Sequence, residues 1–280
     1  WGILFVCIPE TTRERGLIRM TTLQRPPVAL PKNPVPRQQF AFFPTFSDRP
    51  HPTRWEFPAY LDNPGCRWLQ CVKEMYAMPI VFPASLSPEA GLMLHSLIRN
   101  LRPRVVVEVG TYLSVSTHWI ASALKENGDG GVIHCFDDFG PIHKGPWRDA
   151  EMLEGRFEWV KDRLAKAGLL EFVRFHPGDS STQIVAERGQ LSFEGGVDVV
   201  LIDGDHSVPG ACKDLWAVEP VLNTGGYVLL HDTYPELCGD HDGPRHILDA
   251  INVITQGCYE KCELNLSPLN YGMGLLRRVG

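Results

Sequence analysis

The chain has 280 residues, of which 44% are hydrophobic and 21% charged, with a formal net charge of −6. These proportions exclude a fibrous or disordered protein, and the acidic balance argues against a nucleic-acid-binding surface, which needs clustered Lys and Arg. The apolar stretch WGILFVCIP is too short for a membrane span and lacks the flanks of a secretory signal, so we expect a cytoplasmic protein with no membrane and no nucleic-acid partner.

Residues 1–84 are expected to form an N-terminal extension that is rich in proline and aromatic residues. Its central part, with runs such as RPPVALPKNPVPR, shows no sustained period of 2 or 3.6 and is typical of an extended, irregular arm. The aromatic side chains of this arm make it too apolar for a solvated linker. We therefore expect it to pack on the following domain or on a second subunit, which would make the protein a homo-oligomer.

Residues 85–280 alternate between helical and strand patterns and are expected to form one α/β domain. The segment SPEAGLMLHSLIRNL predicts a helix with Ser87 as its cap, and SVSTHWIASALKENG predicts a helix that ends at Gly128. Further helices are expected at 147–167, in DSSTQIVAERG, at 210–222 and in GPRHILDAINVI. Buried strands are expected in RVVVEVG, GVIHCFD, EFVRFH, VDVVLI and GGYVLLHD, with two more in CELNLSP and YGMGLLRRV.

This alternation predicts a Rossmann-like sandwich in which helices cover both faces of a seven-stranded, mostly parallel sheet with an antiparallel strand at one edge. Ligands of such sheets bind beyond the carboxyl ends of the strands, where the strand order reverses. Polar residues follow five of the expected strands, and we expect them to converge on one rim. They are Glu108 with Gly110, Asp137 with Asp138, Asp179, Asp203, and His231 with Asp232.

The first of these strand ends, EVGTYLSVS, lacks the G-x-G-x-x-G pattern of a dinucleotide site, which disfavours an NAD-dependent dehydrogenase. An acid just before a single glycine suits a ligand with positive charge and hydroxyl groups better than a pyrophosphate, because a carboxylate at a helix amino end repels phosphate. Asp137, which ends the second strand, is placed to accept hydrogen bonds from a ribose diol.

Several consecutive segments resemble the motifs of class I S-adenosylmethionine-dependent methyltransferases. They are VVVEVGTYLSVST, IHCFD, HPGDSS, VDVVLIDGDHSVPGACKDLWAVEPVLNTGGYVLLHDT and GPRHILDAI. The resemblance covers residues 85–280 and is strongest to the branch that contains small-molecule and macrolide-sugar O-methyltransferases and cephalosporin-hydroxylase-like proteins. It implies S-adenosylmethionine as the cofactor and a hydroxyl of a small molecule, of sugar, polyketide or phenolic type, as the acceptor.

Carried over to this sequence, the resemblance implies a cofactor site with contacts to the methionine, ribose and adenine portions. Ser114 stands where the family usually has a second glycine, and it would narrow the approach of the backbone to the cofactor. The expected cofactor-binding residues are Glu108, Gly110, Thr111, Ser114, Asp137, Gly178, Asp179, Ser180 and Asp203.

The resemblance also implies a divalent cation held by Asp203, His231 and Asp232. The family usually has an acid at position 231, and two carboxylates with an imidazole would accept Mg²⁺ or Mn²⁺, with a shift toward softer ions. The alternative is that Asp203 and Asp232 bind backbone groups while His231 packs beneath the cofactor.

His206 is the candidate general base, because it lies three positions after Asp203, as does the histidine assigned this role in similar macrolide-sugar enzymes. Asp205 is expected either to orient His206 or to join the cation's ligands, and a purely structural role for His206 is the alternative. His143, Trp147 and His241 are candidates for substrate contact. Two other functions stay open: another reaction on the same fold, as in the cephalosporin-hydroxylase-like proteins, and a non-catalytic cofactor-binding or assembly role.

Overall fold

The computed structural model describes residues 54–141, 155–234, 242–264 and 271–280. These residues form a seven-stranded sheet with the strand order β3-β2-β1-β4-β5-β7-β6. The strands are β1 (Val105–Val109), β2 (Val132–Asp137), β3 (Val173–Pro177), β4 (Val197–Ile202), β5 (Leu222–His231), β6 (Tyr259–Leu264) and β7 (Met273–Arg278).

The predicted mostly parallel sheet is confirmed. Strands β1 to β5 pair in parallel, whereas β7 runs antiparallel to both of its neighbours, β5 and β6. The antiparallel strand therefore lies one place in from the edge, and the edge strand is β6. The order reverses between β1 and β4, so the crevice for a ligand is expected beyond their carboxyl ends.

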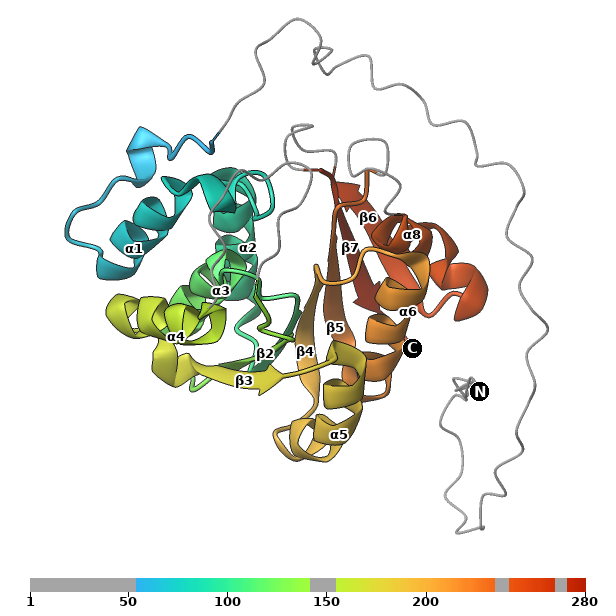
Figure 1. Cartoon of the computed structure of the whole chain (residues 1–280). Helices are drawn as coiled ribbons and strands as arrows, with labels where there is room; N and C mark the ends of the chain where they lie inside the picture. Colours follow the sequence, from blue (N-terminus) through green and yellow to red (C-terminus); the bar gives the residue numbers. More distant parts are fainter. Residues whose placement is uncertain (1–53, 142–154, 235–241, 265–270) are drawn as a thin grey trace, which may run out of the picture.

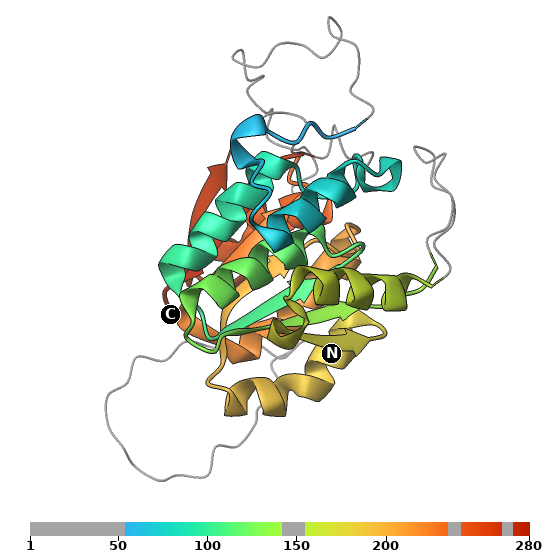
Figure 2. The same ribbon diagram turned by 90° about the vertical axis from the view of Figure 1, so that its left-hand side faces the viewer.

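Helices cover both faces of the sheet (Figures 1 and 2). On one face α2, α3 and α4 pack against side chains such as Val106 and Leu201, and on the other α5, α6 and α8 pack against side chains such as Val107 and Val200. The alternation along each strand follows from the period of 2, and burial of both faces explains the nearly continuous apolar runs. The helices are α2 (Pro88–Leu101), α3 (Val115–Asn127), α4 (Arg156–Ala167), α5 (Ser180–Phe193), α6 (Val208–Val218) and α8 (Gly243–Ile254).

Local sequence signals set the helix ends. Ser87 caps α2 by accepting a hydrogen bond from the backbone N–H of Ala90, and Asp179 caps α5 through the N–H of Thr182. Helix α3 ends at Gly128, which adopts a left-handed conformation that glycine tolerates without strain. The predicted helix over 147–167 is described only from Arg156, because residues 142–154 lie outside the described part of the chain.

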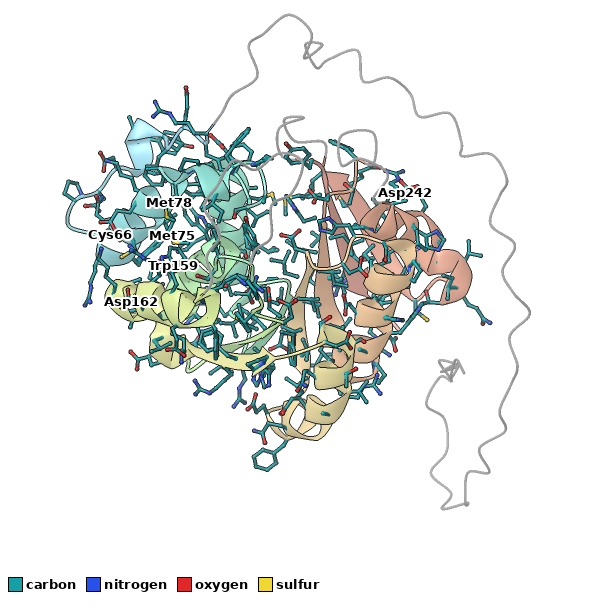
Figure 3. All side chains as sticks on the ribbon, in the orientation of Figure 1. Cys66, Met75, Met78, Trp159, Asp162 and Asp242 are labelled. Atoms are coloured by element: carbon teal, nitrogen blue, oxygen red, sulfur yellow. The ribbon has the colours of Figure 1, made fainter. Side chains whose placement is uncertain are left out.

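The described part of the N-terminal region packs on the helical layer formed by α3 and α4. Helix α1 (Arg67–Tyr76) contacts both of these helices, and short 3-10 helices lie at Ala59–Leu61 and Pro79–Val81. Trp55, Met75, Met78 and Trp159 belong to a third apolar cluster, in which the last three are labelled in Figure 3. Residues 1–53 of the predicted arm lie outside the described residues.

Within the described residues, none of the helices has both the length and the apolar character that crossing a bilayer requires.

Helices α2 and α3 meet at Gly91, where a β carbon would lie 2.1 Å from Nε1 of the buried Trp119 indole. We expect Gly91→Ala to lower the free energy of unfolding by about 1–3 kcal/mol, because the indole has no space to move into. The matched control is Gly189→Ala in α5, where nothing lies within 4 Å of the added carbon. That substitution should instead stabilise the protein by about 0.5–1 kcal/mol. Urea unfolding of both variants measures the difference, and equal effects would contradict this packing.

Candidate active site

A cavity of about 630 Å³ lies at the carboxyl ends of β1 to β4, where the strand order reverses. The loops after these four strands supply most of its lining, and five aspartates and one arginine are among the lining residues. The charged lining residues are Asp137, Asp138, Arg156, Asp179, Asp203 and Asp205. The predicted convergence of strand-end carboxylates is thus present, and the cavity has an excess of negative charge.

The close approach of two backbone segments shapes the centre of the cavity. Gly110 follows β1 with φ +86°, and a β carbon at this position would lie 2.2 Å from the carbonyl oxygen of Asp203. The N–H of Asp203 in turn donates to the carbonyl of Val109 at 2.9 Å. Any side chain at position 110 would therefore separate the ends of β1 and β4, which explains the single glycine in the EVGTYLSVS segment.

Glu108 lies beneath the first loop, outside the cavity lining, and its side chain is fully buried. Its carboxylate accepts hydrogen bonds from hydroxyl groups of the loop and of the first turn of α3 and from a thiol on β2. Burial raises the pKa of Glu108, although these donors oppose the shift. The donors are Thr111, Ser116, Thr117 and Cys135.

Two residues of the loop after β1, Thr111 and Ser114, are also predicted to bind the cofactor. Thr111 directs its hydroxyl to Glu108 at 3.1 Å, and Ser114 is buried and donates to the carbonyl of Leu113 at 2.5 Å. Neither residue lines the cavity. Ser114 adopts a left-handed backbone with φ 64°, the conformation for which glycine is the usual choice. In this structure Glu108, Thr111 and Ser114 are buried and stabilise the loop after β1 through hydrogen bonds.

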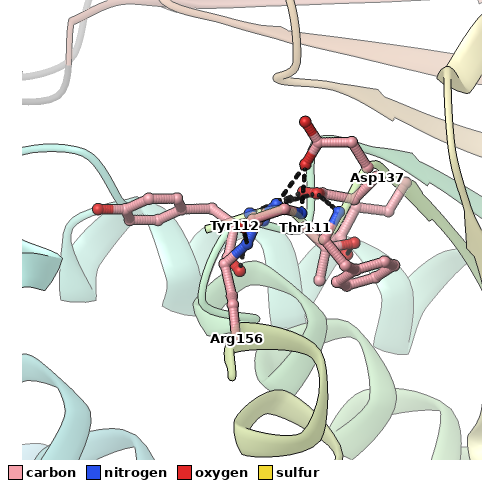
Figure 4. Close-up of polar contacts among 8 residues, drawn as sticks. Thr111, Tyr112, Asp137 and Arg156 are labelled. Atoms are coloured by element: carbon pink, nitrogen blue, oxygen red, sulfur yellow. Dashed lines mark hydrogen bonds and ion pairs between the residues drawn. The ribbon is translucent and has the colours of Figure 1, made fainter. Parts of the chain in front are cut away.

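The end of β2 carries two adjacent acids that share one arginine. Figure 4 labels the first of these acids, Asp137, and Arg156. Arg156, the first residue of α4, contacts Asp137 Oδ1 at 2.6 Å and Asp138 Oδ1 at 2.5 Å through Nη2. The Asp137 carboxylate also accepts from the backbone N–H groups of Tyr112 and Phe139, at 2.8 and 2.7 Å. The loops after β1 and β2 are therefore joined at this carboxylate.

The end of β3 supplies another wall, where Gly178, Asp179 and Ser180 line the cavity. Their contact with an adenine stays a prediction. Hydrogen bonds from Thr182 hold the pKa of the Asp179 carboxyl below its ordinary value. The Ser180 hydroxyl donates to Asp214 Oδ1 at 2.5 Å, which connects the wall to a buried acid on α6.

Two carboxylates and two imidazoles meet at the ends of β4 and β5. His231 Nδ1 lies 3.0 Å from Asp203 Oδ1 and 3.1 Å from Asp232 Oδ1. His206 spans the same two acids, with Nε2 3.4 Å from Asp203 Oδ1 and Nδ1 3.3 Å from Asp232 Oδ2. Asp232 has a left-handed backbone with φ 57°, a strained conformation of the kind that clusters at functional sites.

The histidines and aspartates of this cluster alter one another's proton affinity. Burial disfavours the ionised Asp203, but the His231 charge and hydrogen bonds from both imidazoles hold the pKa of Asp203 at about 2. Burial also disfavours the protonated His206, yet Asp203 and Asp232 together raise its pKa above the ordinary value. The cluster therefore presents an imidazole with enhanced affinity for a proton.

The same cluster has a donor set suited to a divalent cation. One ligand atom each from Asp203, His206 and Asp232 lie within 4.8 Å of one another. The prediction named His231 in place of His206, and the structure brings both imidazoles to the two acids. Asp205 lines the cavity and accepts a hydrogen bond from the N–H of Ser207 at 2.9 Å.

Sequence reasoning missed Arg156 and Asp214, although both are buried charged residues at the site. Nothing near Arg156 in the sequence marks it, since its partner Asp137 is 19 residues away. Asp214 had a weak signal, because it and Lys213 are the two charged residues of an otherwise apolar helix. The substrate candidates His143, Trp147 and His241 lie outside the described residues.

Comparison with known proteins shows what this part of the chain is similar to. Residues 107–233 match a family described as a methyltransferase domain. The segment contains the strand ends of β1, β2, β3, β4 and β5 that surround the cavity, so the predicted resemblance to class I methyltransferases is confirmed for the part of the chain that carries the site.

Curated relatives and solved structures agree with this assignment. A protein of Mycobacterium sp. (strain JLS), provisionally named an O-methyltransferase, is 30% identical over 154 residues, which cover 52% of this chain and 56% of that protein. A protein of Mycolicibacterium smegmatis with the same provisional name is 33% identical over 125 residues, or 41% of this chain and 59% of that protein. The matches thus span little more than half the length of these relatives.

Two solved structures share the fold of this chain. The O-methyltransferase TomG of Streptomyces achromogenes, involved in tomaymycin synthesis and solved with SAM, has a TM-score of 0.55 and 18% identity over 78% of this chain and 91% of that chain. The O-methyltransferase of Bacillus cereus, solved with SAH, has a TM-score of 0.54 and 18% identity over 76% of this chain and 90% of that chain.

The buried carboxyl of Asp214 on α6 leads to a prediction about the stability of the protein. Burial and the charges of Asp179 and Asp205 raise the pKa of Asp214 from 3.8 to about 6. The folded state therefore binds this proton more tightly than the unfolded state, so the stability from Asp214 is present below pH 4 and is lost as pH rises through 6. At 1.36 kcal/mol per pKa unit, the loss is about 3 kcal/mol.

We expect Asp214→Asn to be more stable than the native protein by up to about 3 kcal/mol at pH 8 and to differ little from it at pH 4. Denaturant unfolding of both proteins across this range measures the difference. Asp179→Asn is the control and should show the opposite sign, because hydrogen bonds lower the pKa of Asp179 in the folded state. A pH-independent difference for Asp214→Asn would contradict the prediction.

Proposed function

We propose that the protein transfers a methyl group from S-adenosylmethionine to a hydroxyl oxygen of a small molecule. The observation that carries this proposal is the position of the imidazole and carboxylate cluster at the rim of an acid-lined cavity in a methyltransferase domain. The names of the curated relatives and the ligands of the solved structures support the same reaction.

The charge of the cavity supports a cationic ligand. Five carboxylates and one guanidinium line it, and this balance attracts the sulfonium and ammonium groups of S-adenosylmethionine while it repels phosphates. The glycine at position 110 allows the ligand to approach the backbone at the switch point. Asp137 and Asp138 lie at the end of β2, where one carboxylate would accept hydrogen bonds from the ribose hydroxyls, and Gly178 to Ser180 would form the wall for the adenine.

The reaction needs the acceptor oxygen to be aligned with the methyl carbon and the hydroxyl proton of the acceptor to be removed. The acceptor oxygen attacks the methyl carbon, the carbon–sulfur bond breaks with its electron pair going to sulfur, and the acceptor's hydroxyl proton is released. A sulfonium methyl is already electrophilic, so the protein's tasks are to orient the reactants and to make the oxygen more nucleophilic. We assign proton uptake to His206, because Asp203 and Asp232 stabilise its protonated form.

A divalent cation is a second way to activate the oxygen. Asp203 and Asp232 with an imidazole fit Mn²⁺ or a softer ion better than Mg²⁺, which prefers oxygen ligands alone. When bound there, a cation would lower the pKa of an acceptor hydroxyl. His206 cannot serve as a ligand and as a free base at once, so the two versions assign it different roles.

Binding of the methyl donor is the first test of this proposal. We expect isothermal titration to detect binding of both S-adenosylmethionine and S-adenosylhomocysteine, and to detect none of ATP, because the acid-lined cavity disfavours a triphosphate. ATP shares the adenosine portion and is therefore the matched control. Folded protein that binds neither S-adenosylmethionine nor S-adenosylhomocysteine would contradict the proposal. ATP binding as strong as that of these two ligands would contradict the electrostatic argument.

His206 is tested by the transfer of a labelled methyl group to a panel of hydroxylated small molecules. His206→Asn should lower turnover roughly 10²–10⁴-fold, the usual scale of general acid–base catalysis, while the affinity for S-adenosylmethionine stays within about twofold. His95→Asn is the control, because His95 on α2 stacks on Trp68 of α1 and does not line the cavity. A second experiment separates the role of His206 as a base from its role as a metal ligand. The native protein and His206→Asn are each titrated with Mn²⁺, and binding is followed by electron paramagnetic resonance. Mn²⁺ binding that His206→Asn abolishes favours the ligand role over the base.

A further inference from the structure

We propose that Arg156 is a positioning residue that engages Asp137 within the protein and leaves Asp138 as the carboxylate that binds the ribose hydroxyls of the methyl donor. This inference rests on the proposed function and refines it. The sequence predicts Asp137 for the contact with the ribose, and the hydrogen bonds of the two adjacent acids lead to a different assignment.

Arg156 is almost fully buried, with 6% of its surface exposed, and its guanidinium is surrounded by acceptors. Besides the two carboxylates, it donates to the carbonyl of Gly140 at 2.7 Å through Nε and to the carbonyl of Tyr112 at 3.4 Å through Nη1. One side chain thus joins the loop after β1, the loop after β2 and the start of α4. A buried charge is tolerated only when it is paired and hydrogen-bonded in this way.

The acceptor positions of Asp137 are taken by the protein itself. Oδ1 accepts from the N–H of Phe139 at 2.7 Å and from Arg156 Nη2 at 2.6 Å. Oδ2 accepts from the N–H of Tyr112 at 2.8 Å and from Arg156 Nη1 at 3.4 Å. A carboxylate offers about four lone-pair sites, so a diol could bind Asp137 only by displacing one of these donors. Its side chain is also only 9% exposed.

Asp138 has the opposite character. Its side chain is 76% exposed and lines the cavity. The N–H of Gly140 and Arg156 Nη2 both contact Oδ1, so the carboxylate keeps acceptor positions for a ligand. Burial works against the ionised form, but the Gly140 N–H and the Arg156 charge lower the pKa of Asp138 below its ordinary value. The acid is therefore ionised at neutral pH and oriented by two donors that both contact Oδ1.

The position of Arg156 in its helix points to the same role. A cation in the first turn of a helix is disfavoured by the helix dipole, so stabilisation of α4 does not account for an arginine there. Lysine would supply the charge without the planar fork that contacts two carboxylates and two carbonyls together. The geometry therefore calls for a guanidinium specifically.

The experiment compares S-adenosylhomocysteine with its 2′-deoxy analogue by isothermal titration on the intact chain. The native protein should bind the deoxy analogue roughly tenfold to hundredfold more weakly, as expected when a hydrogen bond to a charged group is lost. In Asp138→Asn this ratio should fall to within about threefold. Arg156→Lys should lower the ratio too, because Asp138 loses its fixed orientation.

The matched control is Arg188→Lys. Arg188 on α5 donates hydrogen bonds to the backbone carbonyls of Trp216 and Ala217 on α6. This variant should keep the native ratio of the two affinities.

The ratio of the two affinities separates positioning from a general effect on stability, which would weaken both ligands equally. A native ratio in Asp138→Asn, or a ratio that collapses only in folded Asp137→Asn, overturns the assignment. If the native protein binds both ligands equally well, this inference fails while the proposed function stands. If the folded native protein binds neither S-adenosylhomocysteine nor S-adenosylmethionine, the proposed function itself fails.

Discussion

The structure depends on one close contact between backbones, that of Gly110 with the carbonyl of Asp203, where a β carbon would lie 2.2 Å from the oxygen. This contact places the ends of β1 and β4 side by side at the point where the strand order reverses. The loop after β1 then lies next to the histidine and aspartate cluster. A methyl donor and an acceptor oxygen could meet at this edge because no side chain stands between the two strands.

Carboxylates at this edge are stabilised by different partners, and the partner decides what each can do. Hydroxyl groups surround Glu108, a guanidinium holds Asp137, and two imidazoles hold Asp203. Burial and the nearby charges of Asp179 and Asp205 raise the pKa of Asp214 to about 6, although Ser180 donates a hydrogen bond to it. A strand-end acid therefore has no fixed role, because solvent access and the nearest donor determine whether it binds a ligand, moves a proton or shapes a loop.

Sequence reasoning predicts the features that depend on strand direction. Parallel strands bring their carboxyl ends to one edge, so Asp203, His206, His231 and Asp232 could be expected to meet. The burial of a side chain is not predicted in this way, because it depends on contacts between segments that are distant in the sequence. Glu108 is hidden by hydroxyls on α3 and a thiol on β2, and Arg156 is recognisable only once Asp137 lies beside it. Neither contact leaves a periodic trace in the sequence.

The ion pairs of Arg156 also join a helix to the acids of the cavity. Arg156 is the first residue of α4, and its guanidinium contacts both carboxylates at the end of β2. A shift of the amino end of α4 would therefore withdraw the cation that the two adjacent acids share and leave their negative charges facing each other. Electrostatic repulsion between neighbouring carboxylates thus fixes where this helix can begin.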